Sequence, residues 1–199
     1  FIYAIADDKV FMMSSEHSPN TPMWKGALAR AVNATTGEQI WTLMSFGAQL
    51  GREGTALADG TWVYYNYYNA QLYAIGKGPS ALSVSAPDVG VELGKSLVIR
   101  GSVTDISAGT MQNEQAARFP YGVPAVSDAS MGAWMEYVYM QKPRPMNALG
   151  VDVVLSVLDS NNNYREIGKT ASNSDGFFTL NWKPDIEGLY TVYASFAGS

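Results

Sequence analysis

The chain has 199 residues, of which 47% are hydrophobic and only 16% are charged, and its formal net charge is −5. The hydrophobic fraction is large enough to form a buried core, whereas the negative balance disfavours a nucleic-acid partner, which needs a basic surface. The absence of cysteine excludes disulfides, thiolate zinc sites and thiol catalysis, and no apolar run is long enough for a transmembrane segment.

The N-terminal part of the sequence contains an internal repeat. The run ADDKVF at residues 6–11 recurs as ADGTWVY at residues 58–64, with one residue inserted. Each copy combines a short polar turn with an apolar or aromatic strand, and a second strand follows at residues 27–32 and 71–75, respectively. Together with the many glycines and tyrosines, this pattern predicts an all-β fold.

A turn signature follows the first copy, in the run AVNATTGEQIW at residues 31–41. Asn33 is suited to bonding the backbone two residues on, and Gly37 is suited to the positive φ that closes a hairpin. The run resembles the repeat of the PQQ-binding-like (quinoprotein-type) β-propellers, in which a strand enters an Asp/Asn-x-x-Thr-Gly turn and the next strand ends in Trp. The resemblance implies that residues 1–78 are the C-terminal blades of such a propeller, with Trp41 packed between neighbouring blades.

The predicted blades form only part of a propeller. About two blades are expected here, whereas propellers have about 4 to 8. We therefore expect the rest of a longer chain, or a homo-oligomeric neighbour, to complete them. Phe1 is in keeping with this, because a chain that starts with Phe rather than Met is expected to be internal or processed.

The sequence pattern changes after a Gly- and Pro-containing linker at residues 76–80. Short alternating strands with turn signals are predicted at residues 81–86, 96–104, 150–158, 164–170, 177–182 and 189–196. This spacing is typical of an Ig-like β-sandwich, which we predict for residues 79–199.

Two runs of the second part, residues 170–178 and 184–192, carry a further resemblance. They are similar to the T-x-S-D-x-x-G-x-F/W-x-P-x-x-x-G-x-Y-x-V pattern of bacterial and archaeal extracellular Ig-like modules. A propeller followed by such a module resembles a group of archaeal surface proteins. The resemblance implies an exported protein, located outside the cell or on its surface.

A short helical insertion interrupts the predicted sandwich at about residues 105–149. Its middle, residues 127–141, is the best helix candidate, with an apolar stripe formed by Met131, Trp134, Met135 and Val138. We interpret the stripe as packing on a core. The alternative is a soft partner surface that includes Trp134 and Tyr137.

No catalytic, cofactor or metal site is predicted. His17 is the single histidine and has no partner nucleophile in the sequence. Residues 159–163 have the alternating oxygen ligands of a calcium loop, but Tyr164 and Thr170 occupy the positions that need Gly and Glu. We therefore interpret them as a polar hairpin turn.

Two surface features remain as candidate sites. Asn33 begins an N-glycosylation sequon, Asn-Ala-Thr, although its turn role explains it equally well. In the aromatic run at residues 64–68, strand alternation directs about half of the rings inward, which leaves Tyr65 and Tyr67 as candidates for contact with a glycan or a protein.

The function expected from these features is that of a non-enzymatic surface protein with a role in adhesion, assembly or envelope structure. The alternatives are a fragment of a quinoprotein-like redox enzyme whose active site lies upstream, and a carbohydrate-binding module. The sandwich also lacks one strand after residues 190–196, so we expect an open edge there, completed by downstream sequence or by a partner's strand.

Overall fold

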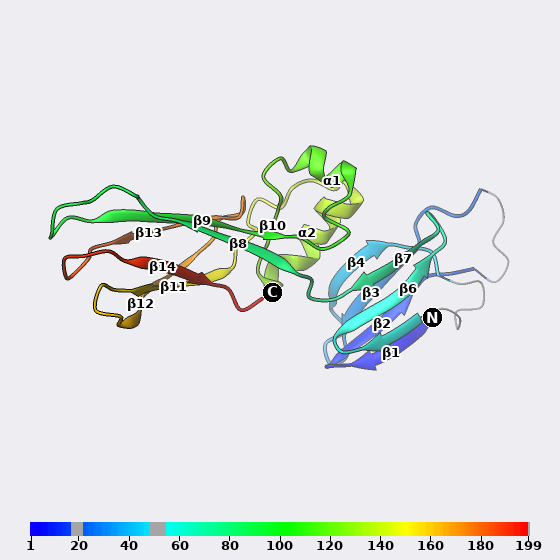
Figure 1. The fold of residues 1–199 in the computed structure, drawn as a ribbon. Helices are drawn as coiled ribbons and strands as arrows, with labels where there is room; N and C mark the ends of the chain where they lie inside the picture. The colour runs from blue at the N-terminus through cyan, green and yellow to red at the C-terminus, as the bar shows by residue number, and fades with distance from the viewer. Residues whose placement is uncertain (17–21, 48–54, 199) are drawn as a thin grey trace. The chain divides into compact units, whose positions relative to one another are not determined.

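The computed structural model describes residues 1–16, 22–47 and 55–198, which are mostly antiparallel β-strands (Figure 1). The chain divides into two compact units. The first unit comprises Phe1–Lys77 and Ala129–Met146, and the second comprises Gly78–Asp128 and Asn147–Ser199. Each unit has its own hydrophobic cluster.

The first sheet of the first unit is a four-stranded antiparallel meander. Its strands lie in chain order: β1 (Ile2–Ala6), β2 (Lys9–Met13), β3 (Leu28–Asn33) and β4 (Gln39–Met44). Asp7 and Asp8 connect β1 to β2 with φ values of 50° and 53°. Two successive positive φ angles belong to the tight hairpin turn whose twist matches that of the flanking strands, and aspartate tolerates this conformation.

The second sheet of this unit repeats that hairpin. It contains β5 (Thr55–Ala58), β6 (Thr61–Asn66) and β7 (Gln71–Ile75), again in chain order. Asp59 and Gly60 connect β5 to β6 with φ values of 48° and 72°. The sequence repeat is thereby explained, because both copies form an antiparallel hairpin closed by a two-residue turn.

The aromatic inner faces of the two sheets pack against each other. Trp62 and Tyr64 of β6 share a buried cluster with Met13 of β2. The Trp62 ring centroid lies 5.5 Å from that of Phe11 and 6.0 Å from that of Trp41, which is on β4. Trp41 of the first sheet therefore contacts the second sheet through Trp62.

The predicted helix forms as α2 (Asp128–Met140), and its apolar stripe is buried at Trp134, Met135 and Val138. The interpretation of the stripe as a packing face is confirmed. The Thr42 hydroxyl on β4 donates a 2.7 Å hydrogen bond to Glu136 of the helix. Most of α2 belongs to the first unit, although its position in the sequence suggested an insertion into the second domain.

The second unit contains two further antiparallel sheets. One is built from β8 (Ser80–Ser85), β9 (Leu97–Asp105) and β13 (Phe177–Trp182), with the two-residue β10 (Val123–Pro124) also beside β9. The other has the order β12 (Tyr164–Ala171), β11 (Asp152–Leu158) and β14 (Thr191–Ser195). A short helix, α1 (Asn113–Arg118), was not predicted.

Both sheets of the second unit contribute to one hydrophobic core. Ile99 and Val103 of β9 and Phe178 of β13 come from one sheet, and Val153 and Leu155 of β11 come from the other. All five side chains are almost fully buried. The alternation seen in the sequence thus separates core residues from surface residues along the central strands.

Candidate functional site

Asn33 holds the turn between β3 and β4. Its Oδ1 atom accepts hydrogen bonds of 2.9 Å from the backbone N–H groups of both Thr35 and Thr36. Gly37 follows with a φ of 76°, and its N–H donates to the Asn33 carbonyl oxygen. The structural role predicted for Asn33 is confirmed. Glycosylation would modify the Nδ2 atom, which takes no part in these bonds, and remains a prediction.

Tyr65 and Tyr67 form an aromatic pair at the end of β6. Their ring centroids lie 4.9 Å apart, and the rings are almost perpendicular at 88°. Tyr67 is 46% exposed, whereas Tyr64 and Asn66 point inward and are 1% and 2% exposed. The expected division of this run into inward and outward side chains is therefore present, and both candidate tyrosines lie outside the aromatic core.

Tyr65 belongs to a wider apolar surface, the outer face of the β5–β6–β7 sheet. This outer face consists of Ala56, Ala58, Thr61, Val63, Tyr65, Leu72 and Ala74. It contains no charged residue, and Leu72, opposite Tyr65, is 73% exposed. Leu72 was not predicted as a surface residue, although the alternation of β7 places it on the same side as Tyr65.

Trp134 and Tyr137 lie on α2, where their ring centroids are 5.3 Å apart. Trp134 is 3% exposed, so the alternative that placed it on a partner surface is wrong. It belongs instead to the buried stripe of the helix, and its Nε1–H is buried with no hydrogen-bond acceptor among the described residues. Tyr137 is half-buried beside it.

The polar run after β11 is a hairpin turn, as predicted. Asp159 is 4% exposed, and its Oδ1 atom accepts 2.9 Å hydrogen bonds from the N–H groups of Asn161 and Asn163. Arg165 on β12 donates to Asp159 Oδ2 at 2.8 Å and also bonds Asp185. The Asp159 carboxylate thus links the turn to Arg165 on β12.

These contacts predict acid sensitivity of the second unit. The backbone N–H of Asn163, helped by Arg165, lowers the pKa of Asp159. A carboxylate with a lowered folded-state pKa stabilises the fold above its unfolded value of about 3.9. That contribution is lost as the pH falls from about 4 through the lowered value. We expect the denaturant midpoint to decrease across this range.

The Asp159→Asn variant tests the cause of that decrease. It should have a lower denaturant midpoint at neutral pH and a smaller further loss on acidification. Asp88→Asn, at an exposed carboxyl of the same unit, controls for the removal of one negative charge. An equal acid response in the two variants would contradict the assignment to Asp159.

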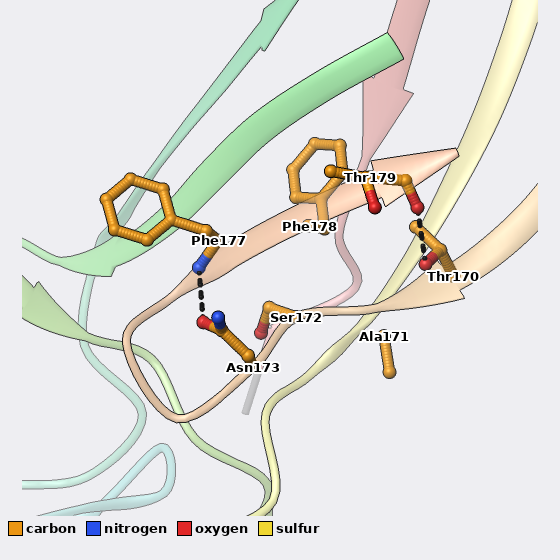
Figure 2. Close-up of a pocket in the computed structure, with 7 residues that line it drawn as sticks. All are labelled: Thr170, Ala171, Ser172, Asn173, Phe177, Phe178 and Thr179. Atoms are coloured by element: carbon orange, nitrogen blue, oxygen red, sulfur yellow. Dashed lines mark hydrogen bonds between the residues drawn. The ribbon is translucent and has the colours of Figure 1, made fainter. Parts of the chain in front are cut away.

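A shallow hollow of about 290 Å³ lies beside the turn from β12 to β13 (Figure 2). It is lined by residues 170–173 and 177–179. Two hydrogen bonds stabilise its wall, from Phe177 N–H to Asn173 Oδ1 at 2.9 Å and from the Thr170 hydroxyl to the Thr179 carbonyl at 3.0 Å. Its lining offers hydroxyl, amide and aromatic groups and no titratable side chain.

The described residues give two further results that bear on function. None of their helices has the length and apolar character needed to cross a bilayer. Within the same residues, no three or more His, Asp or Glu side chains are arranged to hold a metal ion. His17 lies outside the described part of the chain.

Comparisons of the chain with family models, curated proteins and solved structures found no match. Inferences about function therefore depend on the geometry of the chain itself.

Proposed function

We propose that this chain is a non-catalytic part of an exported or cell-surface protein and acts in assembly or adhesion. In this proposal the first unit consists of blades of a PQQ-type propeller, and the second is an Ig-like module. The observation that carries the proposal is the charge-free outer face of the β5–β6–β7 sheet. Its opposite face is packed in the aromatic core, and a sheet with two apolar faces is suited to a stack of sheets.

The arrangement of the first unit supports the propeller part of the proposal. Each sheet is an antiparallel meander, and the two meanders pack through their faces with Trp41 between them. Propellers repeat this arrangement radially, so that each blade covers a face of the next. The exposed side chain of Leu72 lies where another blade would pack.

The strand order of the second unit supports an Ig-like module. The orders β8-β9-β13 and β12-β11-β14 correspond to the A-B-E and C′-C-F strands of an Ig sandwich. Tyr190, directly before β14, donates a 3.0 Å hydrogen bond to the carbonyl of Ile186 and accepts one from its N–H at 3.3 Å. A tyrosine that bonds the backbone a few residues upstream at this corner is a recurrent feature of Ig-like domains.

The outer face of the β5–β6–β7 sheet leads to a prediction for the isolated chain. The native protein should bind the apolar dye ANS, because water-exposed apolar sheet surface binds it. Leu72→Lys should reduce the fluorescence strongly by placing a charge on the outer face, opposite Tyr65. Leu93→Lys, at a leucine 57% exposed outside the strands, is the matched control and should leave it unchanged. Equal effects of the two changes would contradict a binding role of this face.

Titration of the full-length protein with PQQ and calcium tests the proposal against the redox-enzyme alternative, whose active site would lie upstream of Phe1. The proposal expects no tight binding and no dye-linked dehydrogenase activity, and either result would contradict it. Among the described residues no acidic cluster suits the calcium ion of a quinoprotein site.

A carbohydrate-binding role is a second candidate, favoured by the exposed ring of Tyr67 beside Tyr65. Amphipathic aromatic rings stack on sugars while their hydroxyl groups stay in water. A glycan array distinguishes this candidate: it requires hits that are lost in Tyr67→Ala, and a blank array would exclude it.

A further inference from the structure

The turn between β3 and β4 is exposed to solvent. Every residue from 34 to 38 is exposed, as are Asp7 and Asp8 in the turn between β1 and β2. The Ala34 N–H donates a 2.8 Å hydrogen bond to the Asp8 carbonyl oxygen, so the two turns lie side by side at one end of the sheet. The side chains of these turns are small or polar, so a bulky hydrophilic group attached at this end would remain in water.

The Asn33 side chain has one polar atom that the turn does not use. Its Oδ1 atom accepts the N–H groups of Thr35 and Thr36, whereas its Nδ2 atom donates no hydrogen bond among the described residues. Asn33 is half-buried, but Nδ2 is not one of the buried polar atoms that lack a partner, so it reaches solvent. A substituent on Nδ2 would therefore cost the fold no hydrogen bond.

The two threonines that follow have different environments. The Thr36 hydroxyl donates to the Glu38 carboxylate and accepts the Glu38 N–H, both at 3.3 Å. The hydroxyl of Thr35 takes part in no hydrogen bond within the described residues, and Thr35 is exposed. In the sequon of residues 33–35, Thr35 supplies the required hydroxyl, and this is the single Asn-x-Ser/Thr run of the sequence. The acceptor nitrogen and the hydroxyl of the sequon are thus both available.

We propose that Asn33 carries an N-linked oligosaccharide. The donor is an oligosaccharide attached to a lipid phosphate or diphosphate, and a transferase of the export route brings it to the chain. A bond forms between Nδ2 and the anomeric carbon of the first sugar, while the bond from that carbon to the phosphate oxygen breaks. The lipid phosphate leaves with the electron pair, and Nδ2 loses one proton. This inference rests on the proposed function, because the sequon is used in exported proteins.

The modified side chain remains compatible with the turn and with the packing of the first unit. Oδ1 is still a carbonyl oxygen after the transfer, so it can accept the same two backbone N–H groups. The sugar is attached at the end of the sheet, beyond the last residue of β3, and not to a face. Both faces therefore stay available for packing against neighbouring sheets, while the sugar adds a bulky, solubilising group at the sheet end.

Mass spectrometry of the full-length protein from the cells that produce it tests the site. Trypsin cleaves after Arg30 and Arg52, and no other lysine or arginine lies between these positions, so Asn33 is recovered in the peptide of residues 31–52. Fragmentation of this peptide should show hexose or hexosamine units on Asn33. Protease added to intact cells shows in the same experiment whether the protein is on the surface.

Variants expressed in the same cells separate the sequon from the turn. Thr35→Ala removes the sequon but leaves the Asn33 hydrogen bonds, and it should abolish the modification without a loss of stability. Thr35→Ser keeps the sequon and should keep the sugar. Thr36→Ala is the matched control, because it weakens the turn at Glu38 but leaves the sequon intact, and it should also keep the sugar. Asn33→Asp preserves the oxygen acceptor of the turn and should prevent attachment.

The outcomes distinguish this proposal from the proposed function. A surface-located protein with unmodified Asn33 would overturn the glycosylation site and leave the proposed function standing. A protein found only inside the cell would overturn the proposed function and, with it, the site. Sugar that persists in Thr35→Ala, or that is lost equally in Thr35→Ala and Thr36→Ala, would also overturn the assignment to this sequon.

Discussion

Trp62→Ala should destabilise the first unit by about 3–5 kcal/mol, the usual cost of removing a buried tryptophan. Trp62 is 1% exposed and lies at the centre of the aromatic core. Its ring centroid is 4.8 Å from that of Tyr64 and 6.0 Å from that of Trp41 on the other sheet. Its Nε1–H donates a 2.6 Å hydrogen bond to the Thr55 hydroxyl. The alanine variant loses both the contact between the sheets and the bond to β5.

Urea unfolding followed by far-UV circular dichroism measures this loss without relying on tryptophan emission. Trp24→Ala is the matched control, because Trp24 is 49% exposed, and its cost should stay below about 1 kcal/mol. If Trp62→Ala fails to fold, Trp62→Phe keeps most of the packing and should still be less stable than Trp24→Ala. Equal stability of the Trp62 and Trp24 variants would show that the two sheets do not depend on the aromatic core.

Gly101→Ala should destabilise the second unit by about 3 kcal/mol, because there is no room for a methyl group at this position. Gly101 lies in β9, opposite Val84 of β8 and opposite Phe178 of β13. A Cβ atom on Gly101 would meet the backbone carbonyl oxygen of Ser83 and the ring of Phe178. The backbone oxygen is fixed by the sheet, so relief requires β8 to move away from β9.

Hydrogen exchange measured by mass spectrometry localises this effect. Peptides from β8 and β9 should lose protection in Gly101→Ala, while those of the first unit keep theirs. Gly90→Ala is the matched control, since a Cβ at Gly90 meets no atom within 4 Å, and it should change stability by less than about 1 kcal/mol. Unchanged protection of β8 in Gly101→Ala would contradict the tight approach of these strands.

Local signals in the sequence were sufficient for most individual elements. The polar pairs Asp7-Asp8 and Asp59-Gly60 predicted two turns, each followed by a strand, and the structure shows that both turns close two-residue hairpins. The Asn33 turn followed from side-chain chemistry in the same way. The strands of the second unit followed from alternation between apolar and polar residues.

The sequence was less informative about which surfaces meet. Periodicity identified the apolar stripe of α2 but not its partner, so the helix was assigned to the second domain and Trp134 was considered for a partner surface. Leu72 was not recognised because an apolar residue in a strand is ordinarily a core residue. The contact of Arg165 with Asp159 and Asp185 joins one hairpin to a carboxylate 20 residues further along the chain, and spacing alone does not predict it.

The division of the chain into two units also affects how the protein folds during its synthesis. The first unit is discontinuous, since Ala129–Met146 follows a long segment of the second unit. When Phe1–Lys77 have left the ribosome, the chain therefore contains the strands of both aromatic sheets but not α2, whose Glu136 accepts the hydrogen bond from Thr42. Domains generally fold as they emerge, N-terminal part first. Here, the first unit can be completed during translation only after Gly78–Asp128 of the second unit have been synthesised. Until then, the apolar strand surfaces of the first unit are accessible to chaperones.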